Sequence, residues 1–508
     1  MKAIINKVLA IVLVLSIFSC SDLEERPIGL LAPEGLFNTP GDVLNVVYGA
    51  YGGLATEQIY GRQFNIALMF RGDMVDIGDR GTPAARQQVN DFNMDDNNAM
   101  VGAFWPRFYQ VISAANSAIA GSESIVADDA DINPIIAEAR FLRAFSYFHL
   151  VRVFGEIPYI DYFITNPESV VAISKTSVDD VYAGIISDLE YAKEWLPDSH
   201  GNSDIRSRAT KGTAASYLAT VYMTLEDYPK AYTEAKWVID NKDRFGYRLE
   251  ADFQDLYRAE IADNIKEPIF TVDYKGLITG GDNFNVDYNA SMTGIRGAVP
   301  SGWSVAVPSM AVFNTWDDRD YRKRVSFSDS TMMMVDGELT RVSYTSFTNT
   351  KRPHIAKYYR FAGNSEGEFQ NNDHNIILFR YAEILLTAAE ASVEISGPNA
   401  EALGYINQVR ERARNWDGEL STFPEDVEEG MSKNDLIDLI LDDRRLELAF
   451  ESKRWYDIQR RKLGDIVFKG PNSLEPQPNF DAARDYLMPL PRRELDVNPN
   501  LRPQNPGY

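Results

Sequence analysis

Ser365 lies in a pattern that some hydrolases use. Gly363, Ser365 and Gly367 match the G-x-S-x-G sequence of a nucleophile elbow, in which a strand precedes the serine and an apolar helix follows it. The residues directly after Gly367 are mostly polar, and His374 is the only histidine downstream of the serine. The usual order of serine, acid and histidine has little room in so short a stretch. We therefore interpret the match as accidental and predict no nucleophilic hydrolase.

Residues 91–102 begin like a calcium-binding loop. Asp91, Asn93 and Asp95 occupy its first, third and fifth positions. An EF-hand needs glycine at the sixth position and glutamate at the twelfth, where this chain has Asp96 and Gly102. The pattern excludes an EF-hand and leaves another oxygen-ligated calcium site open. The sequence predicts no cofactor.

The overall charge excludes several classes of partner and site. The 508 residues include 74 acids and 51 Lys or Arg, and the formal net charge is −23. Such a surface repels phosphate backbones, so we predict no nucleic-acid partner. The four histidines show no metal-ligand spacing, and one cysteine can form no internal disulfide, so no metal site is predicted. Carboxylate pairs arise by chance among 74 acids, and the sequence nominates no pair for glycoside hydrolysis.

Cys20, the one cysteine, predicts a lipid anchor. A basic start precedes an apolar run from Val8 to Phe18, which is shorter than the ~20 residues that a membrane-spanning helix needs. Residues 1–19 are therefore interpreted as an export signal. Residues 17–20 (Ile-Phe-Ser-Cys) resemble the bacterial lipobox, so we expect Cys20 to become the lipidated first residue of the mature chain. Residues 20–33 are polar at their start and are interpreted as a tether.

Helical periodicity predicts the elements that must position any site. We expect helices over residues 42–56, 104–120, 134–154, 178–196 and 433–450, and helix–turn–helix units over 211–241 and 379–414. Small residues at Ala219 and Ala231 let the two helices of the first unit pack closely. This unit resembles a tetratricopeptide repeat. We therefore expect a mainly α fold built from divergent tetratricopeptide-like helix pairs.

Residues 243–375 have a different composition. Tyr, Phe, Gly, Asn and Thr are dense there, and short strands are expected at 268–274 and 355–361. We interpret this stretch as an irregular, ligand-facing insertion, because loops on a rigid scaffold often carry binding sites. A single body over 34–508 would then consist of a helical part (34–242), the insertion (243–375) and a second helical part (376–508). The last part would end in an extended tail from residue 470.

Motifs in the C-terminal third resemble those of a known family. They are Phe379-Arg-Tyr-Ala-Glu-Ile-Leu-Leu386, Ala388-Ala-Glu-Ala391, Ile406-Asn-Gln-Val-Arg410, Asp443-Arg-Arg-Leu-Glu-Leu-Ala-Phe-Glu451, Arg454-Trp-Tyr-Asp457, Leu487-Met-Pro-Leu-Pro491 and Gln504-Asn-Pro-Gly-Tyr508. Trp105, Tyr109, Ile112 and Asn116 form a further motif in the N-terminal third. Together with the leader, this series resembles the SusD/RagB family of Bacteroidetes outer-membrane lipoproteins across nearly the whole chain.

The resemblance implies a function without catalysis. It implies a surface-exposed lipoprotein of the outer membrane that binds a nutrient, usually an oligosaccharide and sometimes a peptide. It also implies a partner, a SusC-like TonB-dependent transporter, over which the lipoprotein acts as a lid. A scaffold of divergent tetratricopeptide-like helix pairs belongs to the same expectation.

The charged C-terminal motif is expected to be architectural. Arg444, Glu447 and Glu451 have the i, i+3, i+7 spacing of one helix face, and charges buried among helices must be paired. We predict that these residues lock helix packing. Trp455 and Trp316 are likewise expected to be packing residues.

Aromatic residues in the insertion are the candidate ligand contacts. Sugar rings stack their C–H faces on aromatic side chains, and their hydroxyls need polar partners. The candidates are Trp303, Tyr288 and Phe284, with Asp282 and Asn285 as polar neighbours. The resemblance adds Arg80 and Trp105. We favour Trp303, because Pro300 and Gly302 beside it predict an exposed loop.

Three alternatives stay open from the sequence. The ligand of the same uptake system could be a peptide, the protein could be a surface glycosidase, or it could be a scaffold that binds only protein. Product release would identify the glycosidase. A protein-only scaffold would leave nutrient uptake unchanged when Trp303 is replaced.

Overall fold

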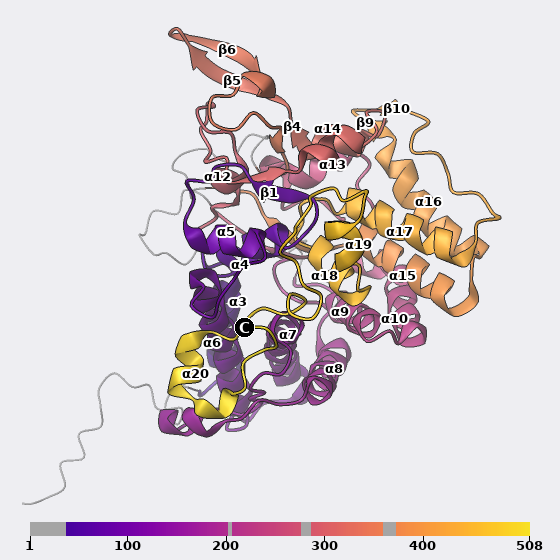
Figure 1. Ribbon diagram of the computed structural model, residues 1–508. Coiled ribbons are helices and arrows are strands. Elements are labelled where there is room, and N and C mark those ends of the chain that lie inside the picture. Colours follow the sequence, from indigo (N-terminus) through magenta and orange to yellow (C-terminus); the bar gives the residue numbers. More distant parts are fainter. Residues whose placement is uncertain (1–36, 202–205, 276–285, 359–371) are drawn as a thin grey trace, which may run out of the picture.

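Residues 37–201, 206–275, 286–358 and 372–508 are described here from a computed structural model (Figure 1). The N-terminal part is helical, and its helices are α3 (Pro40–Leu54), α4 (Gln63–Phe70), α5 (Ala84–Asn90), α6 (Ala99–Ser122), α7 (Asp129–Phe154), η1 (Pro167–Ala172), α8 (Val178–Trp195), α9 (Lys211–Thr224), α10 (Tyr228–Asp240) and α11 (Lys242–Phe245). Side-chain caps begin several of them. The Thr39 hydroxyl accepts from the Asp42 N–H, and the Asp42 carboxylate accepts from the Thr39 N–H in return.

The long helices form one continuous array of neighbours. α3 packs on α6, α6 on α7, α7 on α8, α8 on α9 and α9 on α10. α10 then packs on α15 (Tyr381–Ser396), although residues 241–380 lie between them in the sequence. α15 in turn packs on α16 (Ala400–Ala413) and α17 (Lys433–Glu447). The expected helical-pair scaffold is confirmed, and the insertion leaves the array after α10 and returns to it at α15.

The insertion consists of short helices and two-stranded antiparallel pairs. Its helices are η2 (Phe253–Tyr257), η3 (Ala259–Ile261), α12 (Asn289–Thr293), α13 (Met310–Thr315), α14 (Tyr321–Ser326) and η4 (Tyr344–Ser346). Among the described residues the strand pairs are β1 (Val75–Ile77) with β3 (Ala306–Pro308), β2 (Pro268–Val272) with β8 (Ile376–Arg380), β4 (Phe327–Ser328) with β7 (His354–Ile355), β5 (Ser330–Val335) with β6 (Glu338–Ser343), and β9 (Asn415–Trp416) with β10 (Glu419–Leu420). β1 and β8 lie outside residues 243–375, so strand pairing joins the insertion to both helical parts.

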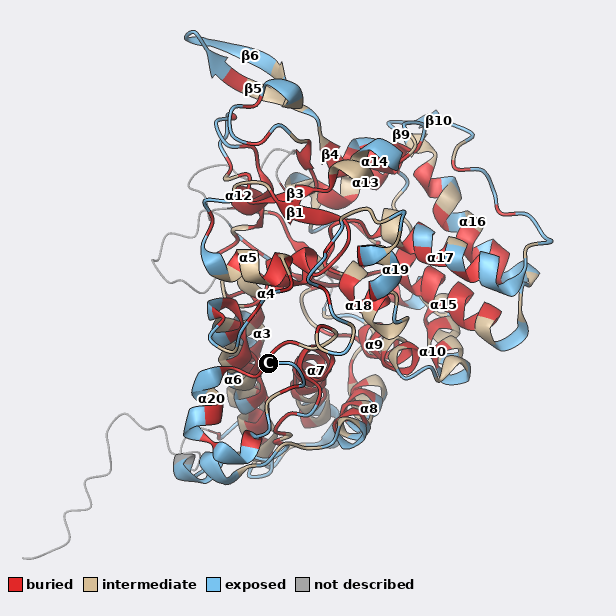
Figure 2. Cartoon of the chain, viewed as in Figure 1, coloured by how far each residue is buried: buried red, intermediate tan, exposed pale blue. Residues whose placement is uncertain are grey.

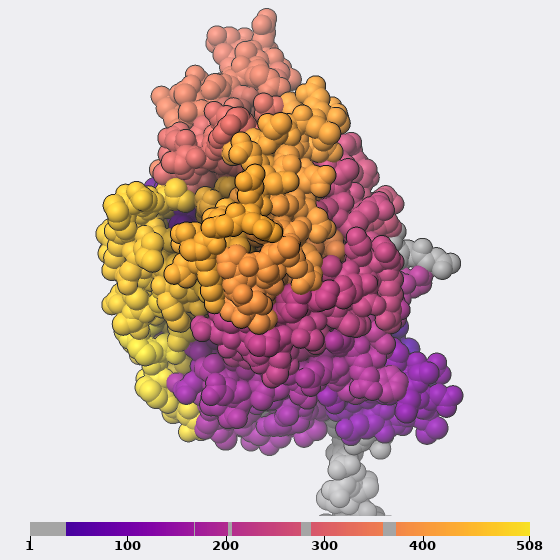
Figure 3. Space-filling view, turned by 90° about the vertical axis from the view of Figure 1, so that its right-hand side faces the viewer, coloured from indigo at the N-terminus to yellow at the C-terminus, as the bar shows by residue number. Residues whose placement is uncertain are grey.

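The C-terminal part ends in short helices and a tail. They are α18 (Arg454–Arg460), α19 (Gly464–Lys469), α20 (Arg492–Val497) and η5 (Pro499–Leu501). The tail is bonded to α7, because the Met488 N–H donates to the Val153 carbonyl and the Asn505 side chain donates to the Phe154 carbonyl. Figure 3 shows this yellow segment along one side of the molecule, with the salmon residues of the β5–β6 hairpin projecting from the top.

Two expected elements end earlier than the sequence indicated. The helix expected over 433–450 stops at Glu447, because Phe450 and Ser452 adopt left-handed backbone angles (φ 65° and 59°) that no α-helix contains. Glu451 therefore reaches its partners from a turn and not from the helix face. The strand expected over 355–361 is only His354–Ile355 within the described residues, and residues 359–361 lie outside them.

The core is centred on α7. Every residue of this helix from Phe141 to Phe154 is buried, and Figure 2 shows buried residues throughout the central helices while the β5–β6 hairpin is largely exposed. Trp316 and Trp455 are buried, as expected of packing residues. Among the described residues we find no helix that combines the length and the apolar character needed to cross a bilayer.

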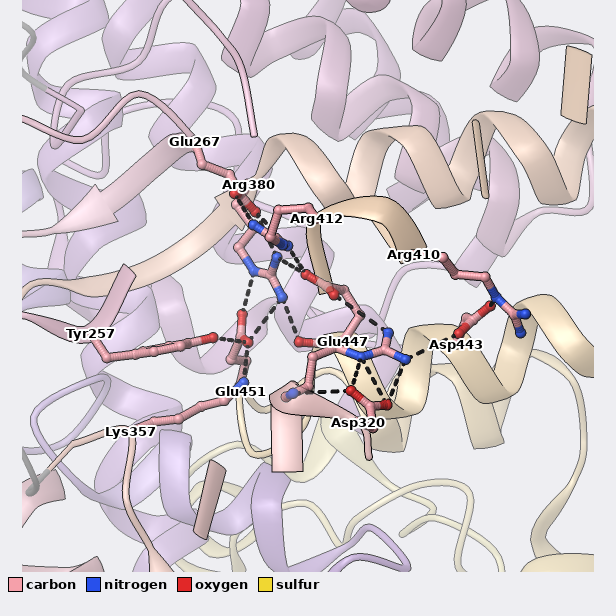
Figure 4. A network of polar contacts seen from close by, with 11 residues as sticks. Tyr257, Glu267, Asp320, Lys357, Arg380, Arg410, Arg412, Asp443, Glu447 and Glu451 are labelled. Atoms are coloured by element: carbon pink, nitrogen blue, oxygen red, sulfur yellow. Dashed lines mark hydrogen bonds and ion pairs between the residues drawn. The ribbon is translucent and has the colours of Figure 1, made fainter. Parts of the chain in front are cut away.

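A buried ionic network fastens the insertion to the C-terminal helices (Figure 4). Arg380 contributes an Nη1 that lies 2.7 Å from Glu267 Oε1 and 2.6 Å from Glu447 Oε1, and its Nε lies 2.9 Å from Glu451 Oε2. Arg412 also pairs with both Glu267 and Glu447. The carboxylates are almost completely buried, so each needs such partners to remain charged. The predicted architectural role of Glu447 and Glu451 agrees with this geometry.

Other members of the network come from the insertion. Lys357 Nζ lies 2.7 Å from Glu451 Oε1, and the Tyr257 hydroxyl donates to the same oxygen. Arg322 pairs with Asp320 and Asp443. Arg444 Nη2 lies 3.8 Å from Glu383 Oε1. Glu390, on the same helix as Glu383, pairs with Arg460 and Arg461.

Acid is expected to unfold this protein through the network. Burial opposes ionisation of Glu447 and Glu451, but the surrounding Arg and Lys charges outweigh it and lower the pKa of each to about 2. The unfolded chain therefore binds more protons than the folded chain below the ordinary glutamate pKa of about 4.5. Stability should be fully present above that value and should fall as the pH drops toward about 2.

Urea unfolding followed by circular dichroism, from about pH 7 to about pH 3, measures this loss. Burial also lowers the pKa of His149 well below its ordinary value. The stability that comes from keeping this histidine neutral therefore begins to be lost below about pH 6.5. Glu451→Gln should flatten the decline at low pH. A free energy of unfolding that stays constant down to about pH 3 would contradict the prediction.

Candidate ligand-binding site

The candidate site is an open hollow where the first helical part meets the insertion. Its wall comes from the loop between β1 and α5 and from the segment that links α12 to β3, which lie together in Figure 1. The hollow has a volume of about 280 Å³. Its lining includes Asp79, Thr82, Arg86, Arg296, Trp303 and Val305. We call it the Trp303 hollow.

Tyr288 and Trp303 form an aromatic pair, and Trp303 is the member of the pair that lines this hollow. Their ring centroids are 5.5 Å apart, and their planes are inclined by 31°. Both residues are half-buried, and the Arg62 guanidinium lies 4.6 Å from the centroid of the Tyr288 ring. Two candidates that are 15 positions apart in the sequence are thus brought into contact. The pair offers the ring surface that stacking against a sugar requires.

The backbone around Trp303 is held tightly by α12. The Trp303 N–H donates to the Ser291 carbonyl at 2.7 Å, and the Ser304 N–H donates to the Gly294 carbonyl. Gly302 is buried, and a Cβ placed on it would lie 2.2 Å from the carbonyl carbon of Gly294. The segment is a loop whose residues 299–301 are exposed, as expected, but Gly302 is buried and Trp303 is half-buried. Gly302 is needed because two backbone segments approach closely there, and Trp303 is half-buried as a result.

Charged side chains surround the aromatic pair. Arg296 Nη2 lies 2.5 Å from Asp79 Oδ2 and 3.2 Å from the Trp303 carbonyl oxygen, to which it donates. Arg86, on α5, donates from Nη1 to the Thr82 hydroxyl at 2.9 Å. Burial lowers the pKa of Arg86 to about 10, and the neighbouring Arg62 charge adds to the effect. The hollow thus combines aromatic surface with N–H donors, which suits a ligand rich in oxygen atoms.

Arg80 and Trp105 take other positions. Arg80 follows β1, but its guanidinium pairs with Asp91 and Asp76 and does not line the Trp303 hollow. Trp105 is buried on α6, with its ring edge-on to Phe154 at 4.7 Å, and it lines a different, apolar hollow beside η1 and α20. Sequence reasoning placed both in the site because the family motif contains them. Asp282, Phe284, Asn285 and the lipidation candidate Cys20 lie outside the described residues.

The carboxylates of the calcium-like loop are bonded to neighbouring residues. The Asp91 carboxylate accepts from Arg80 and from Asn90, and Asp95 Oδ1 accepts from the Asn97 N–H. Ser365 lies outside the described residues. Within the described part of the chain, no three His, Cys, Asp or Glu side chains gather as metal ligands.

Comparison with known proteins gives a consistent result. A model of the SusD family matches residues 304–508, and a model described as "Starch-binding associating with outer membrane" matches residues 62–223. SusD-like protein P2 of Formosa agariphila is 50% identical over 99% of both chains. The chain belongs to the SusD family. Membership of the SusD family accounts for the motifs near the C-terminus, which lie within residues 304–508.

Solved structures of the SusD family share the fold. A SusD homologue from Bacteroides thetaiotaomicron superposes with a TM-score of 0.81, at 21% identity, over 94% of this chain and 98% of the other. A laminarin-binding SusD-like protein gives a TM-score of 0.75, at 23% identity, over 93% of this chain and 100% of the other. Surface glycan-binding protein A of Bacteroides thetaiotaomicron, solved with laminarihexaose, also gives 0.75, at 19% identity, over 92% and 99%.

Arg86, Asp79 and Arg296 were missed by sequence reasoning. None of the three belongs to a motif singled out in the sequence, and the pairing of β1 with β3 brings Asp79 and Arg86 beside the segment that contains Arg296 and Trp303. The register of that pair places Asp76 opposite Val307, which brings the loop after β1 beside Trp303. The TPxxR spacing, from Thr82 to Arg86, was a usable signal, since a threonine four residues before an arginine on a short helix lets the hydroxyl hold the guanidinium.

Proposed function

We propose that this SusD-family chain binds an oligosaccharide at the Trp303 hollow without changing it chemically. The observation that carries the proposal is the Tyr288–Trp303 pair beside an open hollow with N–H donors. Aromatic side chains bury large areas at little entropic cost, and removing apolar surface from water contributes ~25 cal/mol per Å². Two proteins with the same fold support a glycan ligand: one is a laminarin-binding SusD-like protein, and the other was solved in complex with laminarihexaose.

The carboxylates at the hollow favour binding over hydrolysis. Glycoside hydrolysis canonically needs two carboxyl groups, one as acid and one as base or nucleophile. Among the described residues that line the Trp303 hollow, Asp79 is the one acid, and Arg296 is paired with it. One carboxylate, already bonded to a guanidinium, does not supply the pair of acids that this reaction requires. SusD-family proteins are binding proteins, which agrees with this geometry.

A screen of the mature chain tests the proposal. Residues 21–508 would be run in native gels that contain a panel of polysaccharides, with a panel of peptides tested by calorimetry. We expect retention by at least one polysaccharide and no new reducing ends after prolonged incubation. Released sugars would show a glycosidase. Retention by no polysaccharide, together with binding of a peptide, would favour the peptide-binding alternative.

The same proposal places the protein on the outer membrane beside a transporter. A lipid at Cys20 would hold the body at the surface, since each buried acyl CH₂ contributes ~0.8 kcal/mol. Tethering raises the effective concentration of ligand near a TonB-dependent transporter, so a modest affinity suffices for delivery. The family description "associating with outer membrane" supports this location. Affinity purification from solubilised outer membranes should recover the transporter.

Replacing Cys20 tests the anchor. In the native host, Cys20→Ala should abolish acylation and move the protein from the detergent phase to the aqueous phase of a Triton X-114 separation. The physical reason is that the chain then lacks the acyl groups that partition into the bilayer. Ser19→Ala serves as the matched control and should leave the protein in the detergent phase. A Cys20→Ala protein that still partitions with detergent would refute the anchor at this residue.

A further inference from the structure

Arg86 carries a buried charge that faces the Trp303 hollow. The residue is 9% exposed and lies on α5. Its guanidinium donates to the Thr82 hydroxyl, and within the described residues no carboxylate lies within ion-pair distance of it. The arginines around it are paired, Arg62 with Glu57 and Arg296 with Asp79. Arg86 therefore differs from them in having only a neutral partner.

A buried charge without a counter-ion is unfavourable. Desolvation of one ion costs several kcal/mol unless an opposite charge compensates it. The pKa of Arg86 is lowered to about 10 by burial, yet the group stays protonated near neutral pH. Arg86 is one of the residues that line the hollow. A hollow with such a wall favours an anionic group of a ligand, which a guanidinium can bind with two parallel hydrogen bonds.

A second, separate hollow is also lined by arginines. It lies under the β5–β6 hairpin, has a volume of about 740 Å³, and includes Arg324, Arg341, Thr331, Trp416, Val299 and Pro300 in its lining. We call it the hairpin hollow. Its size falls in the ~300–1,000 Å³ range of ligand sites. In Figure 1 α14 lies beside β9, the strand that contains Trp416.

Aromatic surface and cations meet in the hairpin hollow as well. Trp416 stacks on Tyr321, with centroids 5.6 Å apart and an angle of 27°, and the Arg324 guanidinium lies 4.4 Å from the Trp416 centroid. Arg341, on β6, is exposed and donates to the Ser330 hydroxyl. Lys323 is engaged by Asp318. Arg324 and Arg341 are two of the basic residues in the lining of this hollow, on a chain whose net charge is −23.

One segment separates the two hollows. Val299 and Pro300 line the hairpin hollow, while Trp303 lines the other, and the Val299 N–H is bonded to the Met332 carbonyl of β5. Trp303 is three residues after Pro300, so the distance between their Cα atoms is at most about 11 Å. A single extended ligand could therefore cross residues 299–303 and contact both hollows.

We propose that the glycan is acidic, carrying carboxylate or sulfate groups, and that Arg86 binds one such group while Arg324 and Arg341 bind others farther along the chain. This inference rests on the proposed function and adds the chemical class of the ligand. Positive side chains at two points of one path select an anionic polymer, which the negative surface elsewhere repels. A neutral glycan would leave the Arg86 charge uncompensated.

Two matched pairs of probes test the charge. The first pair is alginate oligosaccharides and the same oligosaccharides after carboxyl reduction, and the second is carrageenan oligosaccharides before and after desulfation. Calorimetry should show that the mature protein binds the charged member of at least one pair about tenfold more tightly, and that this preference shrinks with added salt. The responding pair distinguishes carboxylate from sulfate. Equal affinity for both members of each pair would overturn the proposal.

Variants then assign the charge to residues. Arg86→Gln should weaken binding of the charged probe by about tenfold and leave the neutral probe unchanged, since it removes one charge-assisted contact. Arg86→Lys should restore most of the affinity. The double variant R324Q/R341Q should weaken long probes more than short ones. Arg502→Gln, an exposed arginine outside both hollows, is the control and should bind as the unmodified protein does.

Thermal unfolding separates binding from structure. Because Arg86 has no carboxylate partner in the described structure, Arg86→Gln should leave the melting temperature unchanged or raise it. A large fall in the melting temperature would show a structural role and overturn the assignment. If the protein retains only neutral polysaccharides, this inference fails and the proposed function stands. If it retains no polysaccharide of either kind, both fail.

Discussion

Replacing Trp303 with alanine is expected to abolish measurable retention of the glycan in native gels. The change removes the half-buried indole of the Tyr288–Trp303 pair and so removes one of the two rings available for stacking. Tryptophans at the centre of binding sites commonly contribute 2 kcal/mol or more, which corresponds to about a 30-fold loss of affinity. Calorimetry with the glycan found by the screen gives the magnitude.

The control for this change is another half-buried tryptophan. Trp195 closes α8 and packs on Tyr191, and it does not line the Trp303 hollow. Trp195→Ala should leave binding within about twofold of the unmodified protein, since additivity holds for distant sites. Unchanged circular dichroism of both variants would show that the fold persists. A Trp303→Ala protein that binds as tightly as the Trp195→Ala protein would remove this platform from the proposed site.

Replacing Glu447 with alanine is expected to destabilise the fold by about 3–5 kcal/mol. Glu447 is completely buried, and Arg380, Arg412 and Arg322 all lie within ion-pair distance of its carboxylate. Removing that one charge leaves three buried guanidinium groups with fewer partners. Urea unfolding at neutral pH gives the change in the free energy of unfolding. The dependence of that free energy on urea concentration is measured separately for each variant.

Asp442 on the same helix supplies a matched comparison. Its carboxylate pairs with Arg445, and its side chain is 56% exposed. Exposed pairs of this kind contribute about 0–1 kcal/mol, so Asp442→Ala should be nearly neutral. Glu447→Gln, which keeps the shape and one acceptor, should fall between the two and remains measurable if the alanine variant does not fold. Similar stabilities for Glu447→Ala and Asp442→Ala would contradict an architectural role for the network.

The network also shows how far helix periodicity can be extended along the chain. Spacing alone placed Glu451 on one face with Arg444 and Glu447, and the start of α17 at Lys433 was predicted correctly. The left-handed turn at Phe450 was not predicted, because nothing in its side chain marks it. That turn directs Glu451 toward Lys357 and Arg380, which lie far from it in the sequence. Local propensity cannot report a conformation that distant ion pairs stabilise.

The candidate site, like the ionic network, was predicted only in part from the sequence. Tyr288 and Trp303 could be nominated because aromatic side chains in an irregular stretch suit stacking against a sugar ring. The buried position of Gly302 and the entry of Arg86 depend on α12 and on the pairing of β1 with β3, which join segments more than 200 residues apart. Arg80 and Trp105 were nominated through the family motif alone, and the structure directs them elsewhere.

Residue order was enough to predict the helical array, the class of fold and the family, because amphipathic spacing and short motifs are properties of neighbouring residues. It was enough, too, to predict an anchor at Cys20. Which side chains share the Trp303 hollow, and which charge there lacks a carboxylate, followed only from packing. Those features depend on contacts between distant segments, whose free energy is gained only when the whole chain has folded.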